Sequence, residues 1–559
     1  MGASKVYEVL ADAFAREGAE VLFTLMGDGN MHWVARLSAH DGFRTYYVRH
    51  EHCAAAMASA YARATGKVGV ASVTCGPGVT QLSTALATAA QAGIPLVVFA
   101  GESPLHLSWY NQHIDQGPLV TATGAHYIAA HSLPRLLEQV RDAFFIARTE
   151  QRPVVIGVPY DLQKQTLEPA SPYIPSTAFI PDTGRMVPNP DFVDRASDMI
   201  AAARRVIVIA GRGAKLSGAE AACRQLAELV DGLLATTLPV RGLFDADPFS
   251  LGVAGGFSSD VAREKFAECD LVVAVGASLT QFTTDGGKLY PGARVIQIDP
   301  EPRGIRHARK AADLYLRADA KAGLEAVIDA LRARARSRPA QWRTPELARR
   351  IAEEPSDSTR FEPQPGMLDP RAAITALNRV IPRDWEIVNS SGHCSYFSAQ
   401  MRGRDAERFL AIREFGAIGN GLSYAVGMAA AKPDKTVVLI DGDGSFYMHA
   451  QELETVRRHG LRILICILND GAFGSEVHKL RADGVDDAGS TFGRGNLADV
   501  ARGFGLRGAT VTSVEQFPGL LDGFARNAGA ELWDIHISDR VTSPVMRRAI
   551  QAKAAAKSA

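Results

Sequence analysis

Polar side chains follow two strand-like apolar runs in the C-terminal third of the chain. A Gly-Asp-Gly turn centred on Asp443 follows the run 436–440, and an Asn-Asp pair ending at Asp470 follows the run 463–468. In open α/β sheets, ligands bind beyond the carboxyl ends of parallel strands, which meet at one edge. Glycines let backbone amides approach an anion, and two carboxylates beside that anion need a cation between them. Because Mg²⁺ commonly binds through one or two carboxylates plus phosphates, the pattern predicts a metal-diphosphate site.

Two other interpretations of these residues stay open, and one similar tripeptide occurs elsewhere in the chain. Asp443 could act only as the N-terminal cap of a helix. The residues from Asp441 to Glu452 imitate part of an EF-hand loop, although that motif needs Gly where Phe446 stands and a helix in front of it. A second Gly-Asp-Gly, centred on Asp28, has no partner at the same distance further along.

The elements that must position these residues are visible as apolar runs. Strand-like runs alternate with helix-like runs almost throughout the chain, a pattern typical of parallel sheets covered on both faces. We therefore expect an α/β protein with doubly wound parallel-sheet domains. After the second glycine of the Asp443 turn, a helix is expected to run to Gly460. The clearest strand-like runs are Val68–Val73, Pro95–Ala100, Val154–Val158, Val206–Ala210, Leu271–Val275, Val295–Ile298, Thr436–Ile440 and Ile463–Leu468.

Two stretches of different composition divide the chain. Residues 171–191 are rich in Pro, Ser and Thr, and residues 334–370 are charged and Pro-rich. A length of 559 residues allows about three or four domains of ordinary size. We therefore expect three α/β units, at 1–172, 190–335 and 365–545.

Composition limits the class of protein. Lys+Arg and Asp+Glu both number 61, and this zero net charge argues against a general nucleic-acid binder, which usually has a basic face. The N-terminus lacks a basic start followed by an apolar stretch, and no run of about 18 uncharged apolar residues appears, so we expect no signal peptide and no membrane span. The six cysteines are scattered without a CxxC spacing, which is typical of reduced core thiols in a cytoplasmic protein.

The paired strand ends resemble the sequence fingerprint of enzymes that depend on thiamine diphosphate (ThDP). That fingerprint begins with a GDG turn and ends with Asn-rich residues. Here Asp470 follows Asp443 by 27 residues. The resemblance implies that Asp443 and Asp470 bind Mg²⁺ through their side chains and that the Ala472 carbonyl completes the set. The family usually has Asn-Asn where this chain has Asn469 and Asp470, so Asn469 is the alternative ligand if the register shifts by one residue.

A segment near the N-terminus provides a second resemblance. Residues 46–102 closely resemble the pyrimidine-binding domain of acetolactate synthase-like enzymes. The resemblance implies that Glu51 is the catalytic acid that contacts the aminopyrimidine of ThDP; the alternative is a surface salt bridge at a strand-to-helix junction. Gln112 stands at the position where the related enzymes have an active-site Gln. His113 stands at the next position, where those enzymes commonly have an acidic residue. The possible proton carriers are His50, His113 and His478.

Further segments resemble cofactor-binding segments of the same family. Residues 413–427 resemble the segment that bends ThDP into its V shape, residues 390–397 resemble the loop that touches the diphosphate, and residues 74–81 form a glycine turn beside the cofactor. The cofactor contacts that the resemblance implies are Gly76, Pro77, Gly78, Gly392, His393, Glu414, Ala417, Ile418, Gly442, Gly444, Ser445, Asn469, Phe473 and Gly474.

The resemblance implies the first half of the reaction and leaves the second half open. A ThDP ylide adds to a carbonyl, and the enamine that follows is protonated or attacks a second carbonyl. Glu476 stands six residues after Asp470, a spacing found for a catalytic Glu in the pyruvate decarboxylase branch; the alternative is a solvated helix. We expect a ThDP- and Mg²⁺-dependent, non-oxidative lyase or carboligase acting on 2-oxo acids, either acetolactate synthase-like or a 2-oxo acid decarboxylase.

Other functions and partners stay open. A 2-hydroxyacyl-CoA lyase has the same general layout, and the basic tail 538–559 could close over an acyl-CoA or be a solvated helical end. A non-catalytic scaffold could use the same fold, because fold alone does not imply function. In the central unit, Gly211-x-Gly213 lacks the third glycine of a dinucleotide turn, which leaves flavin or ADP open there. The resemblance also implies a homodimer or homotetramer with active sites between subunits, a small-molecule substrate, and no nucleic-acid or membrane partner.

Overall fold

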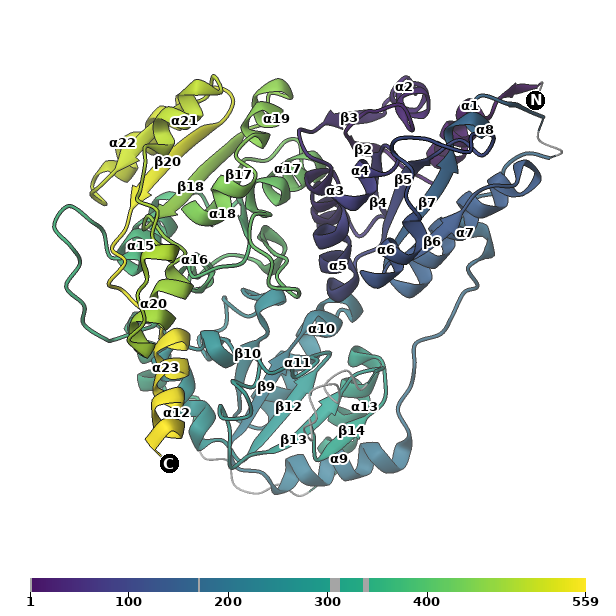
Figure 1. The fold of residues 1–559 in the computed structure, drawn as a ribbon. Helices are drawn as coiled ribbons and strands as arrows, with labels where there is room; N and C mark the ends of the chain where they lie inside the picture. The colour runs from purple at the N-terminus through teal and green to yellow at the C-terminus, as the bar shows by residue number, and fades with distance from the viewer. Residues whose placement is uncertain (1–2, 169–170, 302–311, 335–340, 559) are drawn as a thin grey trace.

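The computed structural model describes residues 3–168, 171–301, 312–334 and 341–558. Within these residues the chain forms three α/β domains, each built on a six-stranded parallel sheet that is flanked by helices (Figure 1). A further antiparallel pair, β1 (Ser4–Lys5) with β8 (Thr166–Leu167), joins the two ends of the N-terminal domain. The expected fold class is confirmed.

The N-terminal domain carries the first sheet, in the order β3-β2-β4-β5-β7-β6. Its central strands are apolar and buried along nearly their whole length, as expected for a sheet covered on both faces. The strands are β2 (Val21–Thr24), β3 (Arg44–Tyr47), β4 (Gly69–Val73), β5 (Leu96–Glu102), β6 (His126–Ala129) and β7 (Pro153–Pro159). The helices are α1 (Val6–Arg16), α2 (Met31–Ser38), α3 (Glu51–Thr65), α4 (Pro77–Thr80), α5 (Ser83–Ala92), α6 (Gln116–Ala122), α7 (Leu136–Glu150) and α8 (Tyr160–Gln163).

The central domain has its strands in the order β11-β10-β9-β12-β13-β14. This is the 3-2-1-4-5-6 order of the doubly wound dinucleotide-binding fold. The strands are β9 (Val206–Ala210), β10 (Leu233–Thr236), β11 (Ser250–Val253), β12 (Leu271–Val275), β13 (Arg294–Ile298) and β14 (Leu314–Leu316). The helices are α9 (Pro190–Ala202), α10 (Arg212–Ser217), α11 (Glu220–Leu229), α12 (Asp260–Glu268), α13 (Ala320–Arg332) and α14 (Pro345–Glu353).

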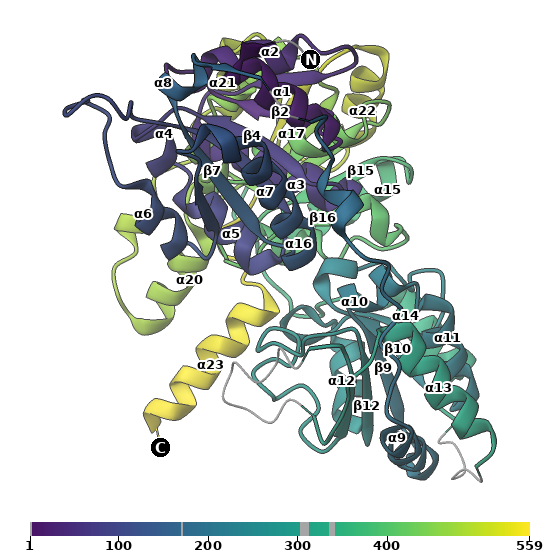
Figure 2. The same ribbon diagram turned by 90° about the vertical axis from the view of Figure 1, so that its right-hand side faces the viewer.

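The C-terminal domain carries the third sheet, in the order β16-β15-β17-β18-β20-β19. The chain ends in a long helix, α23, that extends from this domain beside the central domain (Figure 2). The strands are β15 (Glu386–Asn389), β16 (Phe409–Ala411), β17 (Val437–Gly442), β18 (Ile463–Asn469), β19 (Arg507–Val511) and β20 (Glu531–His536). The helices are α15 (Pro370–Val380), α16 (Cys394–Ser398), α17 (Gly421–Ala431), α18 (Asp443–Met448), α19 (Glu452–Arg458), α20 (Gly474–Asp483), α21 (Leu497–Gly503), α22 (Gln516–Arg526) and α23 (Pro544–Ser558).

The N-terminal and C-terminal domains pack against each other through α3 and α17. These helices carry few large side chains at their contact, and a Cβ added to Gly427 would lie 2.2 Å from the carbonyl oxygen of Met57. His52 Nε2 lies 2.5 Å from Asn420 Oδ1 across the same interface. Buried residues of both helices belong to one hydrophobic core, so the two domains form a single packed unit.

Every strand-like run named from the sequence coincides with a strand, with ends that differ by at most two residues. The expected domain limits 1–172, 190–335 and 365–545 stay predictions, and positions 1 and 335 lie outside the described residues. All six cysteines are free and buried. Among the described residues, no helix combines the length and apolar character that a membrane crossing requires.

The helix expected after the Asp443 turn is interrupted, so that prediction was wrong in part. Helix α18 begins at Asp443 itself and ends at Met448, and α19 begins only at Glu452. Between them His449 leaves the helical conformation, with φ −138° and ψ 34°, and its Nδ1 lies 2.8 Å from the carbonyl oxygen of Gly419. The His449 side chain is thus bound to a distant loop at the residue where the helix is interrupted.

Candidate active site

A cavity opens at the carboxyl edge of the C-terminal sheet. Strands β17 and β18 pair in parallel with Gly442 opposite Leu468, so the turns that follow them emerge side by side. The turn after β15 and the first residue after β20 reach the same edge. The lining residues are Ser391, Gly392, His393, Cys394, Phe397, Ile418, Gly442, Asp443, Gly444, Ser445, Leu468, Asp470, Ala472, Phe473, Gly474, Ser475, Glu476 and Ile537.

Two buried carboxyl groups face each other in this cavity. Asp443 accepts a hydrogen bond from the Gly471 backbone N–H at 2.8 Å, and its carboxyl group is coupled electrostatically to that of Asp470. Burial raises the pKa of Asp443 to about 6, and burial together with the neighbouring Asp443 carboxylate raises the pKa of Asp470 well above its usual range. A cation between them would remove both the repulsion and the desolvation cost. The pair therefore fits a divalent metal ion.

The cavity also fits a phosphate group. The Ser391 hydroxyl lines it and is buried without a hydrogen-bond partner among the described residues. Helix α20 begins at the cavity wall with Gly474, and helix N-termini favour anions. A Cβ on Gly474 would lie 2.4 Å from Asp470 Oδ2, and one on Gly444 would lie 2.7 Å from the Phe473 ring. These glycines keep open the space that a diphosphate would fill.

Asp441 lies beside the pair and has a different environment. It accepts hydrogen bonds at 2.8 Å from the hydroxyls of Ser390 and Ser445, and burial raises its pKa to about 6. It therefore orients the loop and does not line the cavity. A strand precedes it, and Glu452 is bound to the Arg49 backbone N–H at 3.0 Å, so the EF-hand interpretation is wrong.

The helix-cap interpretation of Asp443 is also wrong. Gly442 occupies the N-cap position of α18 with extended backbone, and Asp443 is the first residue of the helix. The Asp443 carboxylate instead reaches the turn after the neighbouring strand, at Gly471. Asp443, which could have been a local helix cap, thus connects the ends of β17 and β18.

Three of the cofactor contacts expected in the C-terminal domain lie outside the cavity lining. Asn469 is fully buried, and its amide donates to Asp534 Oδ1 at 2.7 Å and to the Arg494 carbonyl at 2.9 Å. Glu414 forms an ion pair with Arg63 at 3.0 Å, which links the C-terminal domain to the end of α3. Ala417 precedes the lining residue Ile418 but is not itself part of the lining.

Glu51 and His50 stand at the beginning of α3, and the His50 ring lies 5.2 Å from the His449 ring of the C-terminal domain. His50 is the N-cap, and its Nδ1 accepts the His52 backbone N–H at 3.1 Å. Burial raises the pKa of the half-buried Glu51. The potential ligand atoms of His50, Cys53 and His449 lie within 4.8 Å of one another beside it.

The glycine turn at 76–78 follows β4, at the carboxyl edge of the N-terminal sheet. Pro77 and Gly78 open α4, and Gly76 has φ 56°. A Cβ on Gly76 would lie 2.0 Å from the carbonyl oxygen of Gln112, so only glycine fits there. The structure thus brings Gln112 against this turn, whereas His113 contacts Ser103 at 2.7 Å. None of these residues lines the cavity of the C-terminal domain.

Glu476 lies at the cavity rim. It is in the first turn of α20, its side chain is 53% exposed, and it pairs with Lys479 at 3.2 Å. Its position is compatible both with a catalytic Glu and with a residue of a solvated helix, because the same carboxylate lines the cavity and contacts solvent.

The glycines of the central domain have a packing role. A Cβ on Gly211 would lie 2.2 Å from the carbonyl oxygen of Gly276, and one on Gly213 would lie 2.8 Å from the Gly276 Cα. Close approach of the turn after β9 to the end of β12 therefore explains both residues.

Several lining residues were not found from the sequence. Ser391 is the second residue after β15 and Ile537 is the first after β20, so the rule that ligands bind beyond strand ends could have found them. Phe397 and Cys394 come from α16, whose orientation depends on packing that no local pattern describes.

Models of known families match all three domains. Residues 4–120 match "Thiamine pyrophosphate enzyme, N-terminal TPP binding domain", residues 193–327 match the central domain of the same family, and residues 390–534 match its C-terminal TPP binding domain. Thiamine pyrophosphate is another name for ThDP.

Curated relatives cover most of the chain. It is 30% identical to the acetolactate synthase large subunit of Parasynechococcus marenigrum over 94% of this chain and 86% of the relative. It is also 30% identical to the acetolactate synthase isozyme 2 large subunit of Escherichia coli, over 88% of each chain. The identity to the probable acetolactate synthase large subunit of Methanocaldococcus jannaschii is 30%, over 84% of this chain and 80% of the relative.

The chain therefore belongs to the thiamine pyrophosphate enzyme family, and it is a ThDP-dependent enzyme. Within that family its sequence is similar to the large subunits of acetolactate synthases. The interpretation as a non-catalytic scaffold is not favoured by these matches.

Proposed function

We propose that this enzyme is a ThDP- and Mg²⁺-dependent, non-oxidative carboligase or lyase that acts on 2-oxo acids. The observation that carries the proposal is the pair of Asp443, which is buried, and Asp470, which is partly buried, in a glycine-walled cavity at a strand edge. The relatives are acetolactate synthases, which favours carboligation of 2-oxo acids over acyl-CoA cleavage.

In this proposal the C-terminal domain binds the metal and the diphosphate. Asp443 and Asp470 would ligate Mg²⁺ through carboxylate oxygens and Ala472 through its carbonyl. Asp470 is preferred over Asn469, because the Asn469 amide is already bound to Asp534 and Arg494. The Ser391 hydroxyl and the amides at the start of α20 would bind the phosphate oxygens.

Bound ThDP supplies an electron sink for carbanion chemistry at a substrate carbonyl. Glu51 would hold a proton on its carboxyl group and pass it to the cofactor ring, a role that a raised pKa favours. Glu476 would donate or accept a proton at the open side of the cavity, and Ile418 would exclude water from it. Gln112, His113 and His50 are the further polar groups proposed on the substrate side.

A product screen tests the substrate class. Protein loaded with ThDP and Mg²⁺ is offered pyruvate, longer and aromatic 2-oxo acids, and 2-hydroxyacyl-CoAs, with products identified by mass spectrometry. We expect an acyloin or an aldehyde from a free 2-oxo acid. Formyl-CoA together with an aldehyde or ketone, formed only from the thioesters, would reassign the enzyme to the acyl-CoA lyases.

The proposed active enzyme is a homodimer or homotetramer whose sites lie between subunits. In one chain Glu51 and Gln112 do not line the cavity that holds Asp443, and large apolar side chains are exposed near both regions. A second copy would bring an N-terminal domain to each cavity. The exposed side chains are Trp109, Phe415, Met448, Phe473 and Phe492.

Mixing two inactive variants tests the shared site. Glu51→Gln and Asp443→Ala are unfolded together and refolded as a mixture. If each site combines residues of two chains, random pairing restores about a quarter of wild-type activity, because half of the dimers carry one intact site of two. Sites built within one chain would give no recovery.

The central domain and the location of the enzyme complete the proposal. Mass spectrometry of small molecules released from the denatured protein distinguishes flavin, ADP and neither in the central domain. A cytoplasmic location is proposed because all six cysteines are free and buried.

A further inference from the structure

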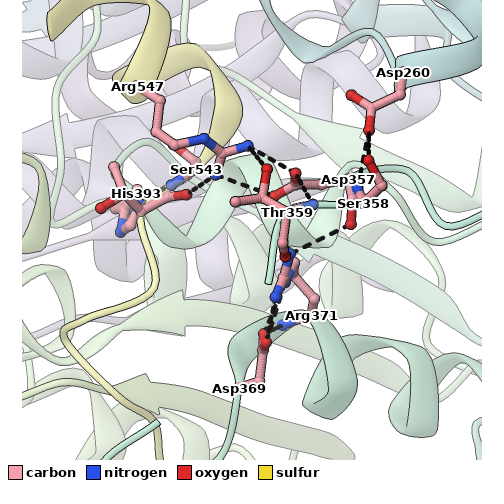
Figure 3. Close-up of polar contacts among 10 residues, drawn as sticks. Asp260, Asp357, Ser358, Thr359, Asp369, Arg371, His393, Ser543 and Arg547 are labelled. Atoms are coloured by element: carbon pink, nitrogen blue, oxygen red, sulfur yellow. Dashed lines mark hydrogen bonds and ion pairs between the residues drawn. The ribbon is translucent and has the colours of Figure 1, made fainter. Parts of the chain in front are cut away.

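Two residues of the C-terminal tail, Thr542 and Ser543, contact histidines at the cavity. The Ser543 backbone N–H lies 3.0 Å from His393 Nε2, and the Thr542 hydroxyl lies 2.9 Å from His478 Nδ1. The two imidazole rings pack against each other with centroids 4.9 Å apart. Two consecutive tail residues therefore hold a pair of histidines. One of them, His393, lines the cavity, and Figure 3 shows it beside Ser543.

The hydrogen bond to His393 determines which ring nitrogen carries the proton. A backbone N–H can only donate, so His393 Nε2 must accept with its lone pair. In neutral imidazole the proton then resides on Nδ1. The Nδ1 side faces the cavity wall, because a Cβ built on Gly474 would lie 3.3 Å from that atom. Among the described residues nothing accepts a hydrogen bond from Nδ1.

We propose that the tail segment 541–548 fixes His393 in the tautomer with its proton on Nδ1, so that the ring presents an N–H donor to the diphosphate. Ser543 is thus a positioning residue that acts through its backbone amide. The inference rests on the proposed diphosphate site. It adds that His393, which lines this site, donates a hydrogen bond to the diphosphate. With the opposite tautomer, a lone pair would face the anion, and a donor would become a repulsive group.

An ion-pair clasp holds the tail in this position. Arg547 contacts Asp357 through two hydrogen bonds, Nη2 to Oδ1 at 2.7 Å and Nη1 to Oδ2 at 3.2 Å. The Arg547 guanidinium also donates to the carbonyl oxygen of Thr542, so the same side chain closes the turn that presents Ser543. The Asp357 side chain is only 2% exposed, and such bidentate, shielded pairs are stronger and more directional than surface pairs.

The partner of Arg547, Asp357, belongs to the segment that precedes the C-terminal domain, and other contacts hold this segment in place. Arg371 pairs with the same Asp357 carboxylate at 3.1 Å, and Ser358 is bound to Asp260 of the central domain at 2.7 and 2.9 Å (Figure 3). The Phe361 ring lies near both guanidinium groups, at 5.0 Å from Arg371 and 5.3 Å from Arg547. The tail is therefore anchored to a part of the molecule that does not depend on the cavity.

Direct observation of the tautomer tests the proposal. Full-length protein is labelled with ¹⁵N-histidine, and the His393 signal is identified by its loss in His393→Gln. The Nδ1 and Nε2 shifts and their couplings then report the protonated nitrogen. We expect the Nδ1–H tautomer in wild type and in Ser543→Ala, which keeps the amide and removes only a hydroxyl that has no partner. Ser543→Pro removes the amide hydrogen, and we expect the Nε2–H tautomer to appear.

Calorimetric titration of metal-loaded protein with ThDP provides the second readout. Ser543→Pro should weaken ThDP binding roughly ten- to hundred-fold relative to Ser543→Ala, the range for a hydrogen bond to a charged group. Arg547→Gln should weaken it several-fold and broaden the His393 signal, because the amide remains but is no longer held in place. Arg540→Gln, an exposed arginine of the same tail, is the matched control and should bind as wild type does.

An Nε2–H tautomer in wild type, or equal ThDP affinity in the Pro and Ala variants, would overturn the inference. If Ser543→Pro fails to fold, Arg547→Gln decides, and unchanged tautomer and affinity in that variant count against the proposal. Failure of the underlying site looks different. In that case Asp443→Ala would bind ThDP as wild type does, while the His393 tautomer in the cofactor-free protein would be unaffected.

Discussion

The N-terminal and C-terminal domains connect six parallel strands in the same order. Numbered within each domain, both sheets follow the order 2-1-3-4-6-5, while the central sheet follows 3-2-1-4-5-6. In both domains the helix after the second strand, α3 or α17, lies at the interface with the other domain. The same backbone plan therefore occurs twice in the chain, and the difference between the two copies lies in their side chains.

The Gly-Asp-Gly tripeptides make that difference concrete. Asp443 follows the third strand of its sheet and is 1% exposed, whereas Asp28 follows the first strand of its sheet and is exposed. Around Asp28 the glycines serve packing, since a Cβ on Gly27 would lie 2.7 Å from Thr74. A motif thus acquires chemistry only when its strand end lies beside another strand end with a matching group.

The largest expected effect separates the two tripeptides. Asp443→Ala should abolish Mg²⁺-dependent retention of ThDP, with an affinity loss of at least about a hundred-fold, because one carboxylate ligand is removed. Asp28→Ala is the matched control and should retain the cofactor. Equilibrium dialysis with and without Mg²⁺ measures both, and equal retention in the two variants would remove the metal role from Asp443.

The second effect concerns the acid at the start of α3. Glu51→Gln should keep ThDP binding and lose about 10²- to 10⁴-fold in turnover, the usual contribution of a positioned acid or base. Steady-state kinetics and ThDP titration are compared on the same preparation. Turnover close to that of wild type would mean that Glu51 has no catalytic role.

The third prediction concerns pH in the metal-free protein. Burial raises the pKa of Asp443 from 3.8 to about 6 in the folded state. A raised pKa means that the folded protein binds the proton more tightly than the unfolded chain does, so the stabilisation is present below about pH 4 and is lost as the pH rises through about 6. The melting temperature should fall over that window, and less so in Asp443→Asn.

Addition of Mg²⁺ and ThDP should reverse this trend. The bound cation competes with protons, so ligand stabilisation should grow as the pH rises through the same window. A ligand effect that is constant from pH 5 to pH 8 would argue that neither Asp443 nor Asp470 binds the metal.

The smallest expected effect lies at the cavity rim. Glu476→Gln should slow protonation or product release more than substrate addition, by about tenfold or less, because its side chain is half exposed. Rapid-quench analysis of covalent intermediates compares this variant with Lys479→Ala, which removes only a surface ion pair and should change little. Identical intermediate distributions in all three proteins would assign Glu476 to a solvated helix.

Much of the fold and part of the site could be predicted from the sequence. The apolar runs located eight strands, and the rule for strand ends placed Asp443 and Asp470 at one edge, where one cavity now holds both. The family resemblance added Ala472, which lines the same cavity. The contact that accompanies the helix break at His449 could not be predicted, because His449 is bound to Gly419, 30 residues away in the chain. The partners of Glu414 and Asn469 were missed for the same reason.

The sequence by itself located eight of the strands and the polar residues that leave the ends of two of them. Those features follow from local apolar periodicity and glycine turns, which act over a few residues. Only the tertiary structure decided which Gly-Asp-Gly is buried beside a second carboxylate, and which tail amide meets His393 from 150 residues away. Burial and long-range hydrogen bonds depend on how separate elements pack, and the chemistry of this enzyme depends on both.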